Sequence, residues 1–370
     1  MLAEVYEALR GALQVDAAAR QAAEQRVVSM RAWPGYASCL TRVTLEASVP
    51  LDVRQLAAVV LKQFVRVHWS ESAEGFVEPM PSDVEKASVR AVLLRGLSDG
   101  TARMRTAVSM VVASVAQHDW PEAWPSLLSE LVTPLEAAAR TTTALASEHD
   151  QATVAGVLRC LELVASELHE EQVPQALHSL LPLLLAVVGN AHAHAPRERA
   201  RAARVGTKLL DRLTMLCDDR KLLNKLQAGP LAQWAAIALA ELSQSAGRAG
   251  PLEDCSLQIA LVRLLRLLAA SLPKSLSPHT GTLVPTVGAL LVRALSAHEA
   301  KLAEGGEGCG APPCDSEGGL LGCEALSTGL FDLLAALGSS SKLYKALQVP
   351  RLLASDPTSF HNSSDHHPTT

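Results

Sequence analysis

Leucine and alanine make up about a third of the chain, and isoleucine and aromatic residues are nearly absent. Among 370 residues there are 61 Leu, 59 Ala and only two Ile (Ile237 and Ile259), with 3% aromatics. Leu and Ala are strong helix formers, whereas strands are enriched in β-branched and aromatic residues. The composition therefore predicts an all-α protein and argues against a β-sandwich, a barrel or a doubly wound sheet.

Apolar residues recur with a helical period in segments separated by short breaks. The predicted helices are residues 2–13, 17–31, 35–48, 51–68, 81–98, 101–118, 121–140, 150–169, 173–190, 196–217, 229–246, 252–272, 281–302 and 320–337. At the start of the fifth segment, Ser82 followed by Glu85 indicates a capping box. Taken in pairs, the segments repeat every 40 to 45 residues or so, the period of HEAT-type repeats. Because so many helices exceed one usual core, we expect an α-solenoid of about seven HEAT-type pairs rather than a compact bundle.

The sequence contains no recognisable catalytic chemistry. It lacks a phosphate-binding G-x-x-x-x-G-K-[ST] loop, a dinucleotide-binding glycine motif, a zinc-protease H-E-x-x-H motif and a G-x-S-x-G nucleophile elbow. Cys309, Cys314 and Cys323 are too widely spaced for a usual zinc site, and His192 and His194 are interpreted as ordinary surface histidines. We therefore expect a protein that is not an enzyme, with no cofactor and no metal.

Charge, hydropathy and cysteine usage indicate which partners and which cellular compartment fit the chain. The net charge of −5 provides no global field toward nucleic acid or anionic lipid. We expect no signal peptide and no membrane span, because the most apolar run, residues 180–188, is short and contains Pro182. The seven scattered cysteines fit a reducing compartment, the cytoplasm or the nucleus.

The segment 51–68 (LDVRQLAAVVLKQFVRVH) has apolar residues around most of its surface and one narrow polar strip. The strip contains Gln55, Lys62 and Arg66, spaced seven and four residues apart. This pattern is typical of the inner helix of a solenoid pair, whose polar line belongs to the concave binding surface. The alternative is a solvated helix face without a partner.

A second strip is strongly basic. It consists of five side chains spaced three or four apart on one helical face, Arg197, Arg201, Arg204, Lys208 and Arg212. Residues 197–225 contain nine basic and four acidic residues, whereas residues 101–171 contain four basic and ten acidic residues. The basic strip is either a solvated face or a contact for an acidic partner, with nucleic acid as a third alternative. The acidic stretch is suited to a basic partner.

Several motifs resemble the importin-β (karyopherin-β) family. Residues 53–63 (VRQLAAVVLKQ), followed by Trp69, resemble the N-terminal signature of that family. Residues 16–25 resemble the second helix of the same domain, and residues 119–125 (DWPEAWP) resemble the D-W-P-x-x-W-P element that opens the fourth repeat. The motifs cover residues 1–140 in the order of the family. Beyond them the similarity is only that of helical repeats.

The resemblance implies a nuclear import receptor that binds cargo on its concave surface and Phe-Gly nucleoporins on its outer side. RanGTP would release the cargo by binding the inner helices of the N-terminal repeats. Lys62 and Gln63 match positions of the family signature, and Gln55 and Arg66 share their strip, so these four are the expected Ran-binding residues. Arg54, on the apolar side, is expected to be structural and partly buried. Trp69, Trp120 and Trp124 are expected to be packing anchors.

The resemblance also implies shuttling between cytoplasm and nucleus, with cargo such as core histones or ribosomal proteins and with no membrane or direct nucleic-acid partner. Family members are much longer, so the sequence is expected to be a truncated N-terminal portion. The alternative function is a HEAT-repeat scaffold without transport activity. The expected divisions are an importin-β N-terminal domain (1–100), HEAT-type repeats (101–302), a flexible Gly/Pro-rich insertion (303–319), a last helical repeat (320–354) and a disordered tail (355–370).

Overall fold

The structure is a computed structural model that describes residues 1–140, 147–216, 220–248, 252, 254–303, 321–340 and 343. Within these residues every regular element is an α-helix or a short 3-10 helix, so the all-α prediction is confirmed. The predicted insertion, apart from Ala303, and the predicted tail lie outside the described residues.

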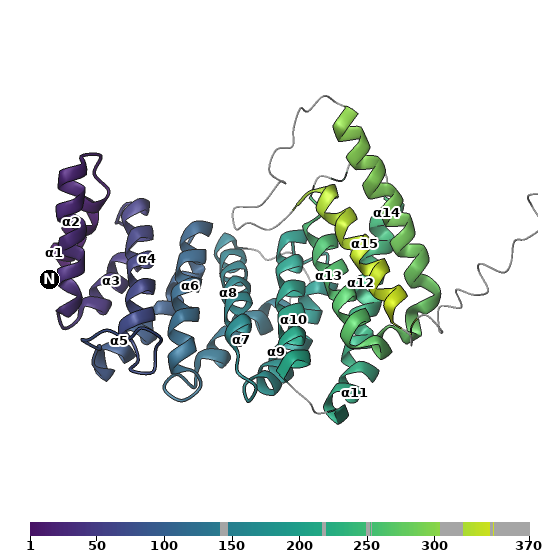
Figure 1. The fold of residues 1–370 in the computed structure, drawn as a ribbon, viewed down its shortest axis with the longest axis horizontal. Helices are drawn as coiled ribbons and strands as arrows, with labels where there is room; N and C mark the ends of the chain where they lie inside the picture. Colours follow the sequence, from purple (N-terminus) through teal and green to yellow (C-terminus); the bar gives the residue numbers. More distant parts are fainter. Residues whose placement is uncertain are drawn as a thin grey trace, which may run out of the picture. The chain divides into compact units, whose positions relative to one another are not determined.

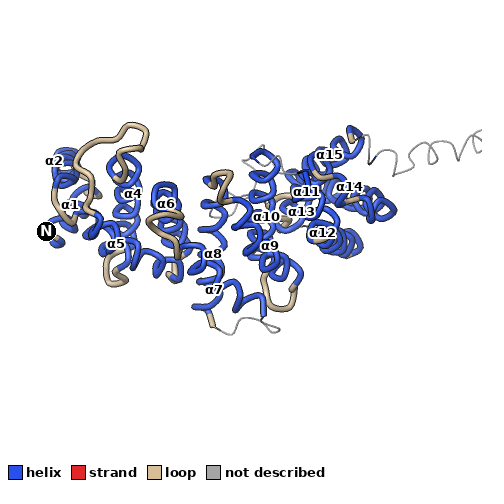
Figure 2. The backbone as a smooth tube through the Cα atoms, turned by 90° about the horizontal axis from the view of Figure 1, so that it is seen from below, coloured by secondary structure: helices blue, strands red, loops and turns tan. Residues whose placement is uncertain are grey.

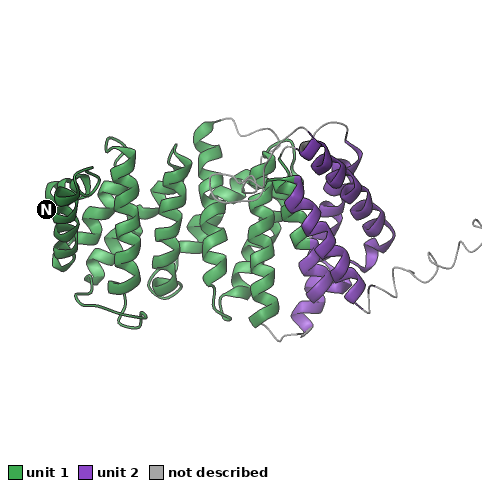
Figure 3. Ribbon diagram, turned by 45° about the horizontal axis from the view of Figure 1, so that its top comes forward, with its two compact units in different colours: residues 1–218, 253–264, 310–322 green, residues 219–252, 265–309, 323–370 purple. Residues whose placement is uncertain are grey.

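The chain divides into two compact units (Figure 3). Unit 1 comprises residues 1–218, 253–264 and 310–322, and unit 2 comprises residues 219–252, 265–309 and 323–370. The boundary falls within α13 (Ser256–Ser271).

Among its described residues, unit 1 contains ten complete α-helices. They are α1 (Leu2–Ala12), α2 (Ala17–Ser29), α3 (Tyr36–Leu45), α4 (Leu51–His68), α5 (Asp83–Leu93), α6 (Ala102–Asp119), α7 (Leu127–Arg140), α8 (Glu148–Glu167), α9 (Val173–Gly189) and α10 (Pro196–Leu216). Two 3-10 helices, η1 (Met30–Ala32) and η2 (Leu94–Ser98), lie at the ends of α2 and α5.

The helices of unit 1 form two rows (Figures 1 and 2). In one row α4 packs on α6, α6 on α8, and α8 on α10. In the other row α1 packs on α3, α3 on α5, and α7 on α9. The core lies between the rows and includes fully buried leucines such as Leu9, Leu40 and Leu127. Since each pair buries its apolar face against the next, this is the α-solenoid expected from the repeat period.

Unit 2 contains α11 (Arg220–Ala228), α12 (Pro230–Gly247), α14 (Thr280–Ala303) and α15 (Cys323–Ser339), with the short helices η3 (Pro273–Ser275) and η4 (Ser277–His279). Here α12 packs on α11 and α14, and α14 packs on α15. Backbone and side-chain hydrogen bonds from Lys274 to Gln227 and Asn224 join η3 to α11.

One segment of the described chain, Ser277–Ala300, is long and apolar enough to cross a membrane by length and composition alone. Its mean hydropathy over an 18-residue window is 1.3. The sequence analysis did not single out this segment, because it considered only uninterrupted apolar runs, whereas α14 is apolar on average and contains few charges. The absence of a membrane span stays a prediction, since an apolar helix of a folded core meets the same criteria of length and composition. In the structure α14 packs on α12 and α15 within unit 2.

Four further differences separate the structure from the sequence predictions. The predicted helix from residue 121 begins only at Leu127, since residues 120–126 form turns, and α11 was not predicted. His194 is buried rather than exposed, with Nε2 3.2 Å from the Ala138 carbonyl oxygen and Nδ1 3.6 Å from Glu198.

The capping box is half present. Ser82 Oγ accepts a hydrogen bond from the Glu85 amide, but the Glu85 carboxylate accepts from the amides of Gly35 (2.9 Å) and Ser38 (3.2 Å) at the start of α3.

Candidate partner-binding surface

One face of α4 presents the four residues predicted to bind a partner, and we call it the α4 polar face (Gln55, Lys62, Gln63 and Arg66). Gln63 and Arg66 are exposed, and Gln55 and Lys62 are partly exposed. Val59 lies among them at helical spacing and is 49% exposed. None of the four polar side chains hydrogen-bonds or pairs with another residue in the described parts of the chain. Their donors and acceptors are therefore free to engage a partner.

The N-terminal half of α4 is anchored by Arg54. This side chain is 8% exposed, and its Nε donates to the Thr44 carbonyl oxygen at 3.0 Å. Its guanidinium also pairs with Asp99, which accepts from the Thr101 amide at the start of α6. The expectation of a structural, partly buried Arg54 is therefore confirmed. Because a buried ion pair is costly to break, Arg54 holds α4 against both α3 and the start of α6.

The C-terminal end of α4 is anchored by Trp69. Its indole Nε1 donates to Asp119 Oδ1 at 3.0 Å, and the other oxygen of Asp119 pairs with Arg90 of α5. The Lys86 ammonium lies 5.8 Å from the centre of the Trp69 ring, a cation–π distance. Asp119 ends α6, so α4 is tied to both ends of α6 and its polar face is held in a fixed position.

Aromatic packing supports the side of α4 that faces the core. Phe64 stacks on His68 with ring centres 4.7 Å apart and meets the edge of Tyr36 at 5.4 Å. His68 is buried, and its Nδ1 lies within hydrogen-bonding distance of the Val77 carbonyl oxygen. Burial lowers the pKa of His68 below its usual value and outweighs the opposing effect of that hydrogen bond. The ring is therefore neutral near pH 7.

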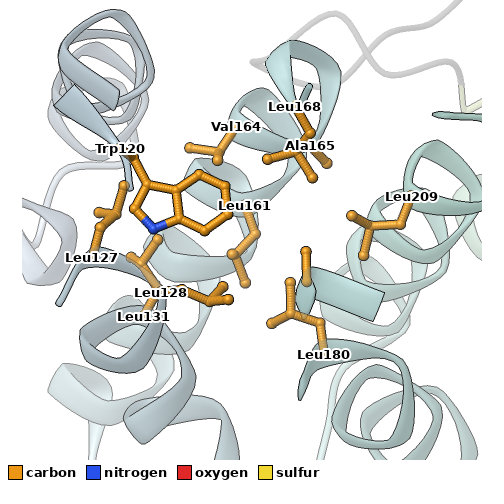
Figure 4. A pocket seen from close by; sticks show the side chains of 11 residues that line it. Trp120, Leu127, Leu128, Leu131, Leu161, Val164, Ala165, Leu168, Leu180 and Leu209 are labelled. Carbon is orange, nitrogen blue, oxygen red and sulfur yellow. The ribbon is translucent and has the colours of Figure 1, made fainter. Parts of the chain in front are cut away.

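Trp120 and Trp124 are buried, as predicted for packing anchors. Figure 4 shows the Trp120 ring among leucine side chains of α7, α8, α9 and α10. They surround a cavity of about 10 Å³, lined by Leu127, Leu131, Leu161 and Leu180 among others. A cavity of this size and apolar character holds no polar ligand, so Trp120 is a packing residue.

The predicted basic strip lies on α10. Three of its five side chains contact α8 or Leu168, the residue that follows α8. Arg204 Nε donates to Glu162 Oε1 at 3.1 Å, and Lys208 Nζ donates to the Glu162 carbonyl oxygen and to Ser166 Oγ. Arg212 donates to the Leu168 carbonyl oxygen at 2.7 Å. Arg197, 63% exposed, pairs with Asp254 at 3.0 Å. Arg201 is partly exposed and also takes part in an interaction. The solvated-face interpretation thus fails for Arg204, Lys208 and Arg212, which have structural contacts, and the partner-binding role of the strip stays a prediction.

Sequence comparison relates the N-terminal part of the chain to a known domain. Residues 23–99 match the Importin-beta N-terminal domain, which therefore includes all of α4. Over 295 residues the chain is 21% identical to importin-9 of Drosophila melanogaster, covering 78% of this chain and 27% of that protein. The chain thus spans about a quarter of the length of this relative.

Solved structures agree on the fold. The exportin Cse1 in its cargo-free, cytoplasmic state superposes with a TM-score of 0.65 at 14% identity, covering 95% of this chain and 36% of Cse1. Kap95 in the Kap95:Nup1 complex gives 0.60 at 16% identity, covering 98% and 36%. Kap95p, whose binding induces the switch loops of RanGDP to adopt the GTP-bound conformation, gives 0.56 at 15% identity, covering 95% and 43%.

The fold is that of the HEAT-repeat nuclear transport receptors. With the match of its residues 23–99 and its similarity to importins, the chain resembles the importin-β family.

Sequence reasoning did not foresee the anchors Asp99 and Arg90. Both are ordinary charged surface residues by pattern, and only the stacking of α4, α5 and α6 makes them partners of Arg54 and Asp119. Asp119 was marked by its place in the DWPEAWP motif, but the motif did not indicate that it accepts the Trp69 hydrogen bond.

Proposed function

We propose that the chain is the Ran- and cargo-binding N-terminal portion of a nuclear import receptor. It acts by linked binding rather than by catalysis, because RanGTP and cargo each lower the affinity for the other. The observation that supports this most strongly is the α4 polar face. It lies within the matched N-terminal domain, it is held in place by buried anchors, and its polar side chains have no partner in the described chain.

In this proposal Gln55, Lys62, Gln63 and Arg66 contact Ran in its GTP-bound state. Lys62 and Arg66 supply positive charge one helical turn apart, and the two glutamines supply donors and acceptors. Exposed Val59 between them provides an apolar contact. Kap95p, which shares the fold, acts on the switch loops of RanGDP, and this supports Ran as the partner class.

The remaining partners follow from the same relationship. Basic cargo such as core histones or ribosomal proteins would bind the acidic stretch of residues 101–171, and Phe-Gly nucleoporins would bind outside the cargo surface. The structure of Kap95 with Nup1 supports a nucleoporin partner. A receptor with these partners shuttles between cytoplasm and nucleus through the pore.

A pull-down separates this function from that of a HEAT-repeat scaffold without transport activity. Purified Ran loaded with a GTP analogue or with GDP is applied to the immobilised chain and to the Lys62→Glu, Arg66→Glu variant. We expect retention of the GTP form alone and its loss in the variant, because the reversed charges repel what the cations attract. The matched control, Arg10→Glu with Arg140→Glu, changes as many exposed charges on α1 and α7 and should bind as the wild type does. Equal binding of both nucleotide states, or none, would favour the scaffold.

A further inference from the structure

Four cationic side chains gather where α8 and α10 pack in unit 1, and we call them the α8–α10 cation cluster (Arg159, Arg204, Lys208 and Arg212). Among the residues that the structure describes, Glu162 is the single buried carboxylate that pairs with members of this cluster. Its Oε2 accepts from Arg159 at 3.2 Å and its Oε1 from Arg204 at 3.1 Å. The side chains of Arg159 and Arg204 are only 17% and 18% exposed, so these charges have lost most of their hydration.

The other two members have no carboxylate partner within the described residues. Lys208 Nζ donates to the Glu162 carbonyl oxygen at 3.0 Å and to Ser166 Oγ at 2.8 Å. Arg212 donates to the Leu168 carbonyl oxygen. Both therefore pair with neutral groups, and the cluster has four positive charges to one buried negative charge.

Several donors of the cluster are unused in the part of the chain that the structure describes. The buried Nε of Arg212 has no hydrogen-bond partner. Arg204 uses only its Nε, and Lys208 uses two of its three hydrogens. A buried donor without a partner costs free energy. The partly desolvated cations also outnumber the carboxylates near them, and an external anion would offset this excess of positive charge.

We propose that the α8–α10 cation cluster binds one or two carboxylates of an acidic segment in a partner protein. Arg204, Lys208 and Arg212 follow one another at four-residue spacing on α10, so an extended acidic segment can reach successive donors. Nucleic acid fits less well, because it depends on many phosphate contacts and this cluster is compact and recessed. The inference stands apart from Ran binding, which the α4 polar face would provide.

The titration of Lys208 reports on the occupancy of the cluster. Burial lowers the pKa of Lys208, Arg159 and Arg204 lower it further, and Glu162 and Glu167 of α8 oppose the shift. A carboxylate bound beside the ammonium would stabilise the charged form and raise this pKa.

The first test is fluorescence anisotropy of a short labelled peptide of alternating Glu and Ser at low salt, with its Gln-for-Glu counterpart as the uncharged probe. We expect the acidic peptide alone to bind, and the Lys208→Gln, Arg212→Gln variant to bind it about tenfold more weakly or worse. Neither Lys208 nor Arg212 pairs with the carboxylate of Glu162, so the variant keeps the ion pairs of that carboxylate with Arg159 and Arg204. The control Arg10→Gln, Arg140→Gln removes the same charge elsewhere and should bind normally.

The second test measures the pKa of Lys208 in the wild-type chain, so it does not depend on a variant that loses peptide binding. The chain is labelled at lysine carbons, the Lys208 signal is assigned by its absence in Lys208→Arg, and its pKa is measured by NMR with and without the acidic peptide. A rise on peptide addition supports the proposal. An unchanged Lys208 pKa, equal peptide binding by the cluster variant and the control, or a preference for an RNA oligonucleotide would overturn it.

Discussion

Two aspartates, Asp99 and Asp119, decide how α4 presents its polar face. Asp99 precedes α6 and pairs with Arg54, and Asp119 ends α6 and accepts from Trp69. Both carboxylates are largely buried, so their partners are required to offset the loss of hydration. Within the described chain the four residues of the α4 polar face make no such contacts, and this division separates the residues that position α4 from those proposed to bind.

His68 makes the stability of the fold depend on pH. Its pKa in the folded chain lies below the unfolded value of 6.5, so the unfolded chain binds more protons as pH falls through that value. We therefore expect the free energy of unfolding to decrease from pH 7 to about pH 5, and this decrease to be smaller in His68→Gln. Urea unfolding at several pH values measures it. His178 is an exposed histidine on α9, so the His178→Gln variant should keep the full pH dependence of the free energy of unfolding. An identical pH dependence in both variants would contradict the assignment to His68.

Single residues also show what a sequence can and cannot predict. Arg54 could be predicted as buried because its angular position on the helix lies among apolar residues. The partners of Glu85 could not be predicted, because a capping box is a local pattern and the amides of Gly35 and Ser38 come near only when α3 and α5 pack. The burial of His194 could not be predicted either, because the local Ala/His run is typical of an exposed loop and Ala138 comes near only in the folded chain.

At the scale of the elements, α8 and η2 approach each other very closely at Gly156. A Cβ atom added there would lie 1.9 Å from the carbonyl oxygen of Leu97. Backbone cannot rotate away as a side chain can, so the absence of a side chain at Gly156 is what permits α8 to pack at this distance.

We expect Gly156→Ala to lower the free energy of unfolding by about 1–3 kcal/mol, the usual cost of overpacking. Gly288 of α14 is a matched control, since a Cβ added there meets no other atom within 4 Å. Gly288→Ala should be neutral or stabilising by up to about 1 kcal/mol, because Ala favours helix. Urea unfolding followed by circular dichroism compares them, and equal effects of the two substitutions would argue against the close approach.

Helix bounds were predictable where periodicity was long and clearly interrupted. The predicted segment 51–68 coincides with α4, since Pro50 precedes it and its apolar period is unbroken. The nine-residue α11 was missed because a short, strongly charged segment shows too few apolar positions to establish a period. The predicted helix 121–140 started six residues too early, because the chain turns over residues 121–126 before α7 begins at Leu127.

At the scale of the whole molecule, repeat stacking decides which predicted surfaces remain available. Both strips were found from helical spacing alone, and spacing cannot tell whether a polar face meets solvent or the next helix. The α4 polar face is open, whereas three members of the α10 strip contact α8 or the Leu168 carbonyl oxygen that follows it. The second surface is consequently a recessed cluster and not an exposed strip.

Ran binding by the α4 polar face, in the GTP-bound state of Ran, is the proposal on which the function of the whole molecule depends. Its most direct test is photo-crosslinking from benzoylphenylalanine placed at Val59, in the middle of that face. Val84 of α5 is the control position, since it is more exposed (78%) than Val59 (49%). We expect a crosslink to Ran loaded with a GTP analogue, none to the GDP form, and none from position 84. A crosslink that ignores the nucleotide, or that forms from position 84 and not from position 59, would contradict the account.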